Sequence, residues 1–260
     1  MKTALQVLAG LMLFLAIAIG GGLFYVSSSF PKVGPAENLK FEYTAQRVER
    51  GRYLAENVSD CFGCHTQHDF GHFGAPIRED VKGGGGFLFD KGLMGLPGNI
   101  YSRNITPSHL KDWTDGELVR ALRSGVSKDG HALFNLMPYQ DFEHLTQEDI
   151  YSLVAYLRTL KPVENDPPAT RLDFPVNFII KTVPRNAGAY PPAPDKKDLL
   201  GYGRYMTRAA LCADCHTPVD GHGNPLPGMD FAGGMEFHFG GATLRTVNIT
   251  PDKTTGIGEW

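Results

Sequence analysis

The sequence predicts a mainly α-helical protein with an N-terminal transmembrane helix and two tandem domains of one type, the second incomplete at its C-terminus. Two observations predict this arrangement: the chain opens with a long uncharged apolar stretch, and one set of short motifs occurs twice along it. The 260 residues are enough for two ordinary domains, and 42% hydrophobic and 20% charged residues are typical of globular proteins.

The first element is the apolar N-terminal segment, residues 1–30. Residues 4–26 contain no charge, and as a helix they would be about 34 Å long, enough to cross the hydrocarbon core of a bilayer. The alternative is a cleaved signal peptide, for which Ser27 and Ser29 would supply the small residues of a cleavage site. We favour an uncleaved anchor, with Lys2 on the cytoplasmic side and the rest of the chain outside.

Four cysteines form two Cys-x-x-Cys-His motifs. Two thiols three residues apart on one helical turn can form thioethers with the two vinyl groups of one porphyrin, and the following imidazole can bind its iron. A zinc site with four thiolates, redox disulfides or structural disulfides are alternatives, but none requires a histidine after both pairs, and zinc ribbons keep their pairs much closer than about 150 residues apart. The sequence therefore predicts two covalent haems, attached through Cys61, Cys64, Cys212 and Cys215, with His65 and His216 as axial iron ligands.

The sequence around each motif is repeated, and the repeat sets the domain boundaries. Both copies contain Gly-Arg-Tyr, the cysteine motif, a glycine-rich stretch, Phe-x-Phe, Asn-Ile-Thr-Pro and a tryptophan; Gly51, Phe87, Asn104 and Trp113 mark the first copy, and Gly203, Phe237, Asn248 and Trp260 the second. We predict domains over 45–160 and 200–260, joined by a proline-rich linker over 161–199. The linker prolines exclude long helices, but its apolar patch 174–183 is expected to pack on a domain.

Two helices are predicted in the second half of the first domain. A capping box, Thr114-Asp-Gly-Glu, opens a helix that continues to about Gly125. A second helix starts after Thr146, has apolar residues at i, i+3, i+4, i+7 and i+10 from Ile150, and stops at Pro162.

The loop between these helices contains Met137-Pro138. An electron-transfer haem usually has Met or His as its second axial ligand, so we predict Met137 as the distal ligand of the first iron. His131, which follows a loop-type Asp-Gly pair, and Met94, which precedes both helices, are weaker candidates, and filling of core space is the other role open to Met137. The counterpart of this loop would lie beyond Trp260, so we expect the sequence to be a fragment of a longer protein.

Together these motifs resemble the multihaem cytochrome c subunits of membrane-bound dehydrogenases, in particular those of bacterial alcohol and gluconate dehydrogenases. The resemblance covers about residues 45–160 and 200–260. It implies class I cytochrome c folds with two haems c, His65 and Met137 on the first iron, and His216 on the second. The alcohol and gluconate subunits typically carry three haem motifs, whereas two are visible here, so the dehydrogenase that this chain would serve stays open.

The resemblance also implies a location and a role. The N-terminal helix would anchor the protein in the bacterial inner membrane, with the haem domains in the periplasm. The chain would be no enzyme itself, but would relay electrons from a periplasmic or membrane dehydrogenase subunit toward the quinone pool or a terminal oxidase. A net charge of −3 without a basic run argues against a nucleic-acid partner. The alternative is a dihaem enzyme of the cytochrome c peroxidase type, with one open haem iron.

The same resemblance implies a contact behind each proximal histidine. The backbone carbonyls of Pro76 and Pro227 would accept the imidazole N–H of His65 and His216 and fix the orientation of the two rings.

Overall fold

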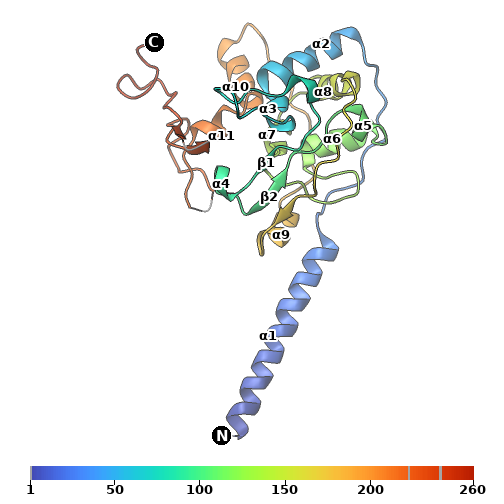
Figure 1. Cartoon of the computed structure of the whole chain (residues 1–260), viewed down its shortest axis with the longest axis vertical. Coiled ribbons are helices and arrows are strands. Elements are labelled where there is room, and N and C mark those ends of the chain that lie inside the picture. The colour runs from blue at the N-terminus through green and yellow to red at the C-terminus, as the bar shows by residue number, and fades with distance from the viewer. Residues whose placement is uncertain (1, 222, 240–241) are drawn as a thin grey trace.

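The computed structural model describes residues 2–221, 223–239 and 242–260, and these are mainly helical, as predicted (Figure 1). One long helix, α1 (Lys2–Ser29), projects from a globular body formed by the rest of the chain. The body begins with α2 (Ala45–Tyr53), the π-helical turn η1 (Leu54–Val58), α3 (Cys61–His65), the 3-10 turn η2 (Glu79–Val81), β1 (Leu88–Phe89), α4 (Lys91–Met94), β2 (Gly98–Tyr101) and α5 (Pro107–Leu110). It continues with α6 (Asp115–Ser124), α7 (Tyr139–Phe142), α8 (Gln147–Thr159), β3 (Arg171–Leu172), α9 (Val176–Ile179), the 3-10 turn η3 (Ile180–Thr182), α10 (Leu199–Ala209), α11 (Cys212–His216), β4 (Glu236–Phe239) and β5 (Ala242–Arg245).

The apolar N-terminal stretch forms the single helix α1, longer at both ends than residues 4–26. Its 28 residues would extend about 42 Å at 1.5 Å per residue. None of its side chains is buried in the body. By length and composition it is able to cross a membrane.

The core of the body is built where α2 crosses α8. A Cβ placed on Gly51 of α2 would lie 1.9 Å from the Ser152 carbonyl oxygen and 2.7 Å from Cβ of Tyr156, so only glycine permits this close approach. Both helices, together with α6 and α7, bury their apolar faces in one cluster. Its members include Leu54, Phe62, Leu110, Leu118, Leu122, Phe142, Leu145, Ile150, Leu153, Val154 and Tyr156.

The two helices predicted between Thr114 and Pro162 are confirmed. Thr114 and Glu117 form the predicted capping box, and Gly125 ends α6 in a left-handed conformation with a φ of 67°. The Thr146 side chain caps α8, which ends three residues before Pro162. The predicted helix boundaries agree with the observed ones because each boundary depends on neighbouring residues, which satisfy the free backbone groups of the terminal turns.

The proline-rich linker contains only short elements in the structure, as expected. Strand β3 pairs antiparallel with β2, with Gly98 opposite Leu172, and so ties the linker to the first half of the chain. The expectation that the patch 174–183 packs on a domain is correct only in part. Ile180 is buried, but Phe174 and Ile179 are 69% and 55% exposed.

Candidate haem sites

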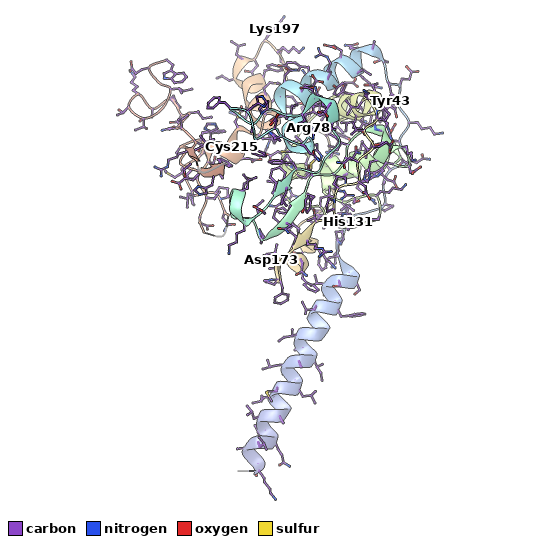
Figure 2. The ribbon with its side chains drawn as sticks, viewed as in Figure 1. Tyr43, Arg78, His131, Asp173, Lys197 and Cys215 are labelled. Carbon is purple, nitrogen blue, oxygen red and sulfur yellow. The ribbon has the colours of Figure 1, made fainter. Side chains whose placement is uncertain are left out.

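Both Cys-x-x-Cys-His motifs form one-turn helices, α3 and α11. Each helix follows a residue in the left-handed region, Asp60 with a φ of 45° and Leu211 with a φ of 57°, so the chain enters both motifs through the same sharp turn. All four cysteines are unpaired. Cys215 lies where α11 borders the rest of the body (Figure 2). Within each pair, both thiols belong to a single turn, as the attachment of one porphyrin requires.

Each motif histidine is held through Nδ1 by a backbone carbonyl. His65 donates to the carbonyl of Arg103 at 2.7 Å, and His216 donates to the carbonyl of Val247 at 2.8 Å. Burial lowers the pKa of His65, which favours the neutral imidazole. With the proton on Nδ1, the lone pair of Nε2 is the one that would bind a metal.

The expected contact with Pro76 and Pro227 is wrong. The Pro76 carbonyl instead accepts the backbone N–H of Asp69 at 2.9 Å. The accepting carbonyls belong to Arg103 and Val247, which immediately precede the repeated Asn-Ile-Thr-Pro. The repeat was recognised in the sequence, but no role was assigned to it. Its occurrence after both Cys-x-x-Cys-His motifs was the signal that could have pointed to these two carbonyls.

The glycine-rich stretches bring these carbonyls to the histidines. The N–H of Gly85 donates to the His65 carbonyl at 2.8 Å, and the N–H of Gly233 donates to the His216 carbonyl at 2.6 Å. A Cβ on Gly85 would lie 2.5 Å from the carbonyl carbon of Arg103, and one on Gly233 would lie 2.5 Å from that of Val247. Both glycines also have positive φ, 68° and 73°. The two halves therefore use one backbone arrangement to hold the imidazole.

The predicted distal ligand packs on the core of the first half. Met137 is half-buried in the loop between α6 and α7, and it packs against the same core cluster that Cys61 contacts. Of its rivals, His131 is exposed and pairs with Asp129 at 2.5 Å, and Met94 lies at the end of α4, which contacts strand β4 in the second half. Met137 therefore stays the predicted ligand.

Tyr139 follows Met137-Pro138 and belongs to the same motif, although the sequence indicated no role for it. Tyr139 is fully buried, but its hydroxyl has no hydrogen-bond partner among the described residues, and burial raises its pKa to about 12. Its ring packs on Gly125, where a Cβ would approach the ring to 2.5 Å. A buried hydroxyl without a partner is costly, so it indicates that a polar group belongs beside it.

The two sites are adjacent. Ser59, two residues before Cys61, donates a buried hydrogen bond of 2.8 Å to the carbonyl of Ala209, three residues before Cys212. The pKa of Cys64 is raised to about 11, mainly by burial, with smaller contributions from the charges of Asp60 and Cys215. The motif helices of the two halves therefore begin side by side.

A buried polar cluster fixes this arrangement. Asp149 of α8 accepts two hydrogen bonds from Arg50 of α2, at 2.7 and 2.9 Å, and a third from the Tyr205 hydroxyl of α10. That hydroxyl also accepts the N–H of Thr146 at 3.2 Å. Burial and the Asp149 carboxylate raise the pKa of Tyr205 to about 12, so it stays a neutral donor.

The Tyr205→Phe variant is expected to weaken the junction between the halves. It removes one hydrogen bond to the carboxylate of Asp149 and one from Thr146, so the free energy of unfolding should fall by about 2 kcal/mol. Urea denaturation followed by circular dichroism measures this. Tyr53→Phe is the matched control, because Tyr53 is an exposed tyrosine near the same arginine. Equal stability of both variants would contradict this role for Tyr205.

The donor set fits haem c. Each site offers two free thiols on one turn and an imidazole whose Nδ1 is already engaged. The described ranges contain no group of three or more His, Cys, Asp and Glu side chains arranged to hold a metal ion. Haem attachment, by contrast, needs only the pair and its histidine.

No family model matches the chain. It is 35% identical to the cytochrome subunit of fructose dehydrogenase from Gluconobacter japonicus over 82% of this chain and 42% of that protein. It is 30% identical to the cytochrome c subunit of the quinone alcohol dehydrogenase from Gluconacetobacter polyoxogenes, over 82% of this chain and 45% of that subunit. It is also 30% identical to a diheme c-type cytochrome from Cereibacter sphaeroides, over 74% of this chain and 64% of that protein. The chain thus spans about half the length of the first two of these relatives.

The sites and the relatives have the same character, and the class of protein that the chain resembles is the c-type cytochromes. More particularly, the chain is homologous to the cytochrome c subunits of membrane-bound dehydrogenases for fructose, alcohol and gluconate. These homologues are electron-transfer subunits rather than catalytic ones. The resemblance predicted from the sequence motifs is confirmed.

Proposed function

We propose that the chain is a membrane-anchored dihaem cytochrome c that relays electrons between a periplasmic dehydrogenase and the respiratory chain. Haem c supplies an iron that gains and loses a single electron. The observation that carries the proposal is the Ser59–Ala209 hydrogen bond, which joins two equivalent sites at the start of their motif helices. Adjacent sites suit transfer of an electron from one to the other.

The residues take the roles for which their positions suit them. Cys61 and Cys64 attach one haem, with His65 and Met137 as its axial ligands. The second haem is attached by the next motif, Cys212 and Cys215, with His216 as an axial ligand. The carbonyls of Arg103 and Val247 orient the imidazoles and make Nε2 a better donor.

The two halves form tandem domains of the class I cytochrome c type, over 45–160 and 200–260, joined by the linker 161–199. Repeated hydrogen bonds around both histidines support this division. Gly203 corresponds to Gly51, but a Cβ there would meet nothing within 4 Å in the part of the chain that the structure describes.

The location and partners follow from α1 and from the relatives. Helix α1 anchors the chain in the bacterial inner membrane, with the haem domains on the periplasmic side. The relatives are dehydrogenase subunits, so a dehydrogenase catalytic subunit is the electron donor that we propose. The quinone pool or a terminal oxidase is the acceptor.

Haem content tests the proposal directly. The protein, produced in a host that attaches haem to c-type cytochromes, should carry two haems that remain bound in acidified organic solvent. A paired substitution, Cys212→Ala with Cys215→Ala, should leave one haem, and so should Cys61→Ala with Cys64→Ala. Colourless protein, or haem that is extracted from the unaltered chain, would refute covalent attachment.

A further inference from the structure

The segment that follows β3 lies against the end of α1 (Figure 1). Both α9 and η3 contact α1, and Lys181 of η3 donates to the Ser27 hydroxyl at 3.4 Å. Leu23 and Val26 are half-buried in this part of α1, and their spacing of three residues places them on one helix face. The segment is therefore held at the level where the apolar run of α1 ends.

The end of α1 and the segment that contacts it contribute aromatic, aliphatic and basic side chains, here called the collar. Its members are Tyr25, Phe30, Lys32, Phe174, Phe178, Ile179 and Lys181. Phe174 and Ile179 are more than half exposed, although the rest of the linker near them is tied to β2 by strand β3. The ring of Phe178 packs edge-on against Phe174, with centroids 6.1 Å apart.

The end of α1 and the residues that follow it have a similar composition. Tyr25 and Phe30 pack edge to face at 6.1 Å, and the ammonium of Lys32 lies 4.9 Å from the centroid of the Phe30 ring. Aromatic rings are enriched at the boundary between headgroups and acyl chains, and lysines there reach toward anionic headgroups while their apolar stems stay in the boundary. The collar contains the aromatic rings and lysines that are enriched at this boundary.

We propose that the collar is seated in the outer leaflet of the membrane that α1 crosses, with Phe174 and Ile179 inserted at the headgroup boundary. This inference rests on the proposed anchoring by α1. It gives the haem domains a second attachment point besides the anchor, so the body cannot swing freely. The end of the body that carries α10 is then directed away from the bilayer, as the placement of Asp173 and Lys197 at opposite ends indicates (Figures 1 and 2).

Site-directed spin labelling of the full haem-loaded chain tests this. In the proposed haem-loaded chain thioethers would occupy the four native cysteines, so a label would attach only to an introduced cysteine, and unaltered protein serves as the labelling blank. Phe174→Cys and Ile179→Cys report on the collar, Leu15→Cys on the middle of α1, and Leu200→Cys on an 85% exposed position of α10 at the far end. The spin-labelled protein, with its haem iron in the ferrous state, is placed in nanodiscs of phosphatidylethanolamine and phosphatidylglycerol.

Labels at 174 and 179 should collide more often with oxygen, which concentrates in the bilayer, than with a water-soluble nickel chelate. The ratio of the oxygen collision rate to the chelate collision rate should be several-fold higher at these positions than at 200. Equal ratios at 174, 179 and 200, with a bilayer signal at 15, would overturn the collar while leaving the anchor intact. A water-exposed signal at 15 as well would overturn the anchoring itself. Shielding of 174 and 179 from both reagents would show that protein covers the collar, which also overturns the proposal.

Discussion

Gly51→Ala is expected to destabilise the first half of the protein by roughly 3 kcal/mol, the upper part of the range for overpacked cores. The added Cβ would lie 1.9 Å from the Ser152 carbonyl oxygen, which belongs to the backbone and cannot turn aside. Helices α2 and α8 would have to separate, and the cluster beneath them would lose contacts. Guanidinium denaturation of the haem-loaded variant, followed by circular dichroism, measures the change.

The repeat supplies the matched control for this experiment. Gly203 holds the equivalent position in α10, and a Cβ there meets nothing within 4 Å among the described residues. Alanine favours a helix over glycine by about 0.5–1 kcal/mol, so Gly203→Ala should leave stability unchanged or slightly raise it. If both alanines cost the same, helix crossing at Gly51 is not what requires glycine.

Met137→Leu is expected to lower the midpoint potential of the first haem by on the order of 0.1 V, because a thioether ligand favours ferrous iron and axial ligands control haem potentials over a wide range. Leucine nearly preserves the side-chain volume, so packing against the core cluster should survive. A spectroelectrochemical titration of the full chain resolves the two haems and measures the shift.

Met94→Leu is the control for this change, since Met94 is the rival methionine and lies at the end of α4. Its potentials should match those of the unaltered protein. A shift for Met94→Leu alone would transfer the ligand role to Met94, and a shift for neither would remove both. A high-spin haem with peroxide turnover in the unaltered protein would instead support the peroxidase-type alternative.

Helices α1, α6 and α8 and the two cysteine motifs could be predicted because they depend on residues close together in the chain. The capping box at Thr114 involves only residues through Glu117, and the α8 boundary involves Thr146 and the apolar spacing that follows it. The attachment of a haem likewise needs five consecutive residues. Homology to cytochrome c subunits, inferred from the same motifs, is confirmed by the curated relatives.

Contacts between distant segments could not be predicted in this way. Arg103 lies 38 residues after His65, and Val247 lies 31 residues after His216. Both carbonyls reach the imidazole because a glycine lets two backbones cross at close range. The contact with the prolines, which was implied by the family resemblance, is wrong, and no local pattern in this sequence states which carbonyl reaches the imidazole.

The amino-acid sequence alone thus determined the local features. These are an apolar helix at the start, two Cys-x-x-Cys-His motifs, and the residues that begin and end α6 and α8. Only the folded molecule decided which groups meet across the chain, namely the carbonyl behind each imidazole, the Ser59–Ala209 contact between the sites, and the exposure of Phe174 beside α1. The physical reason is that turns and caps depend on neighbouring residues. The meeting of remote segments depends instead on how all the apolar faces are buried at once.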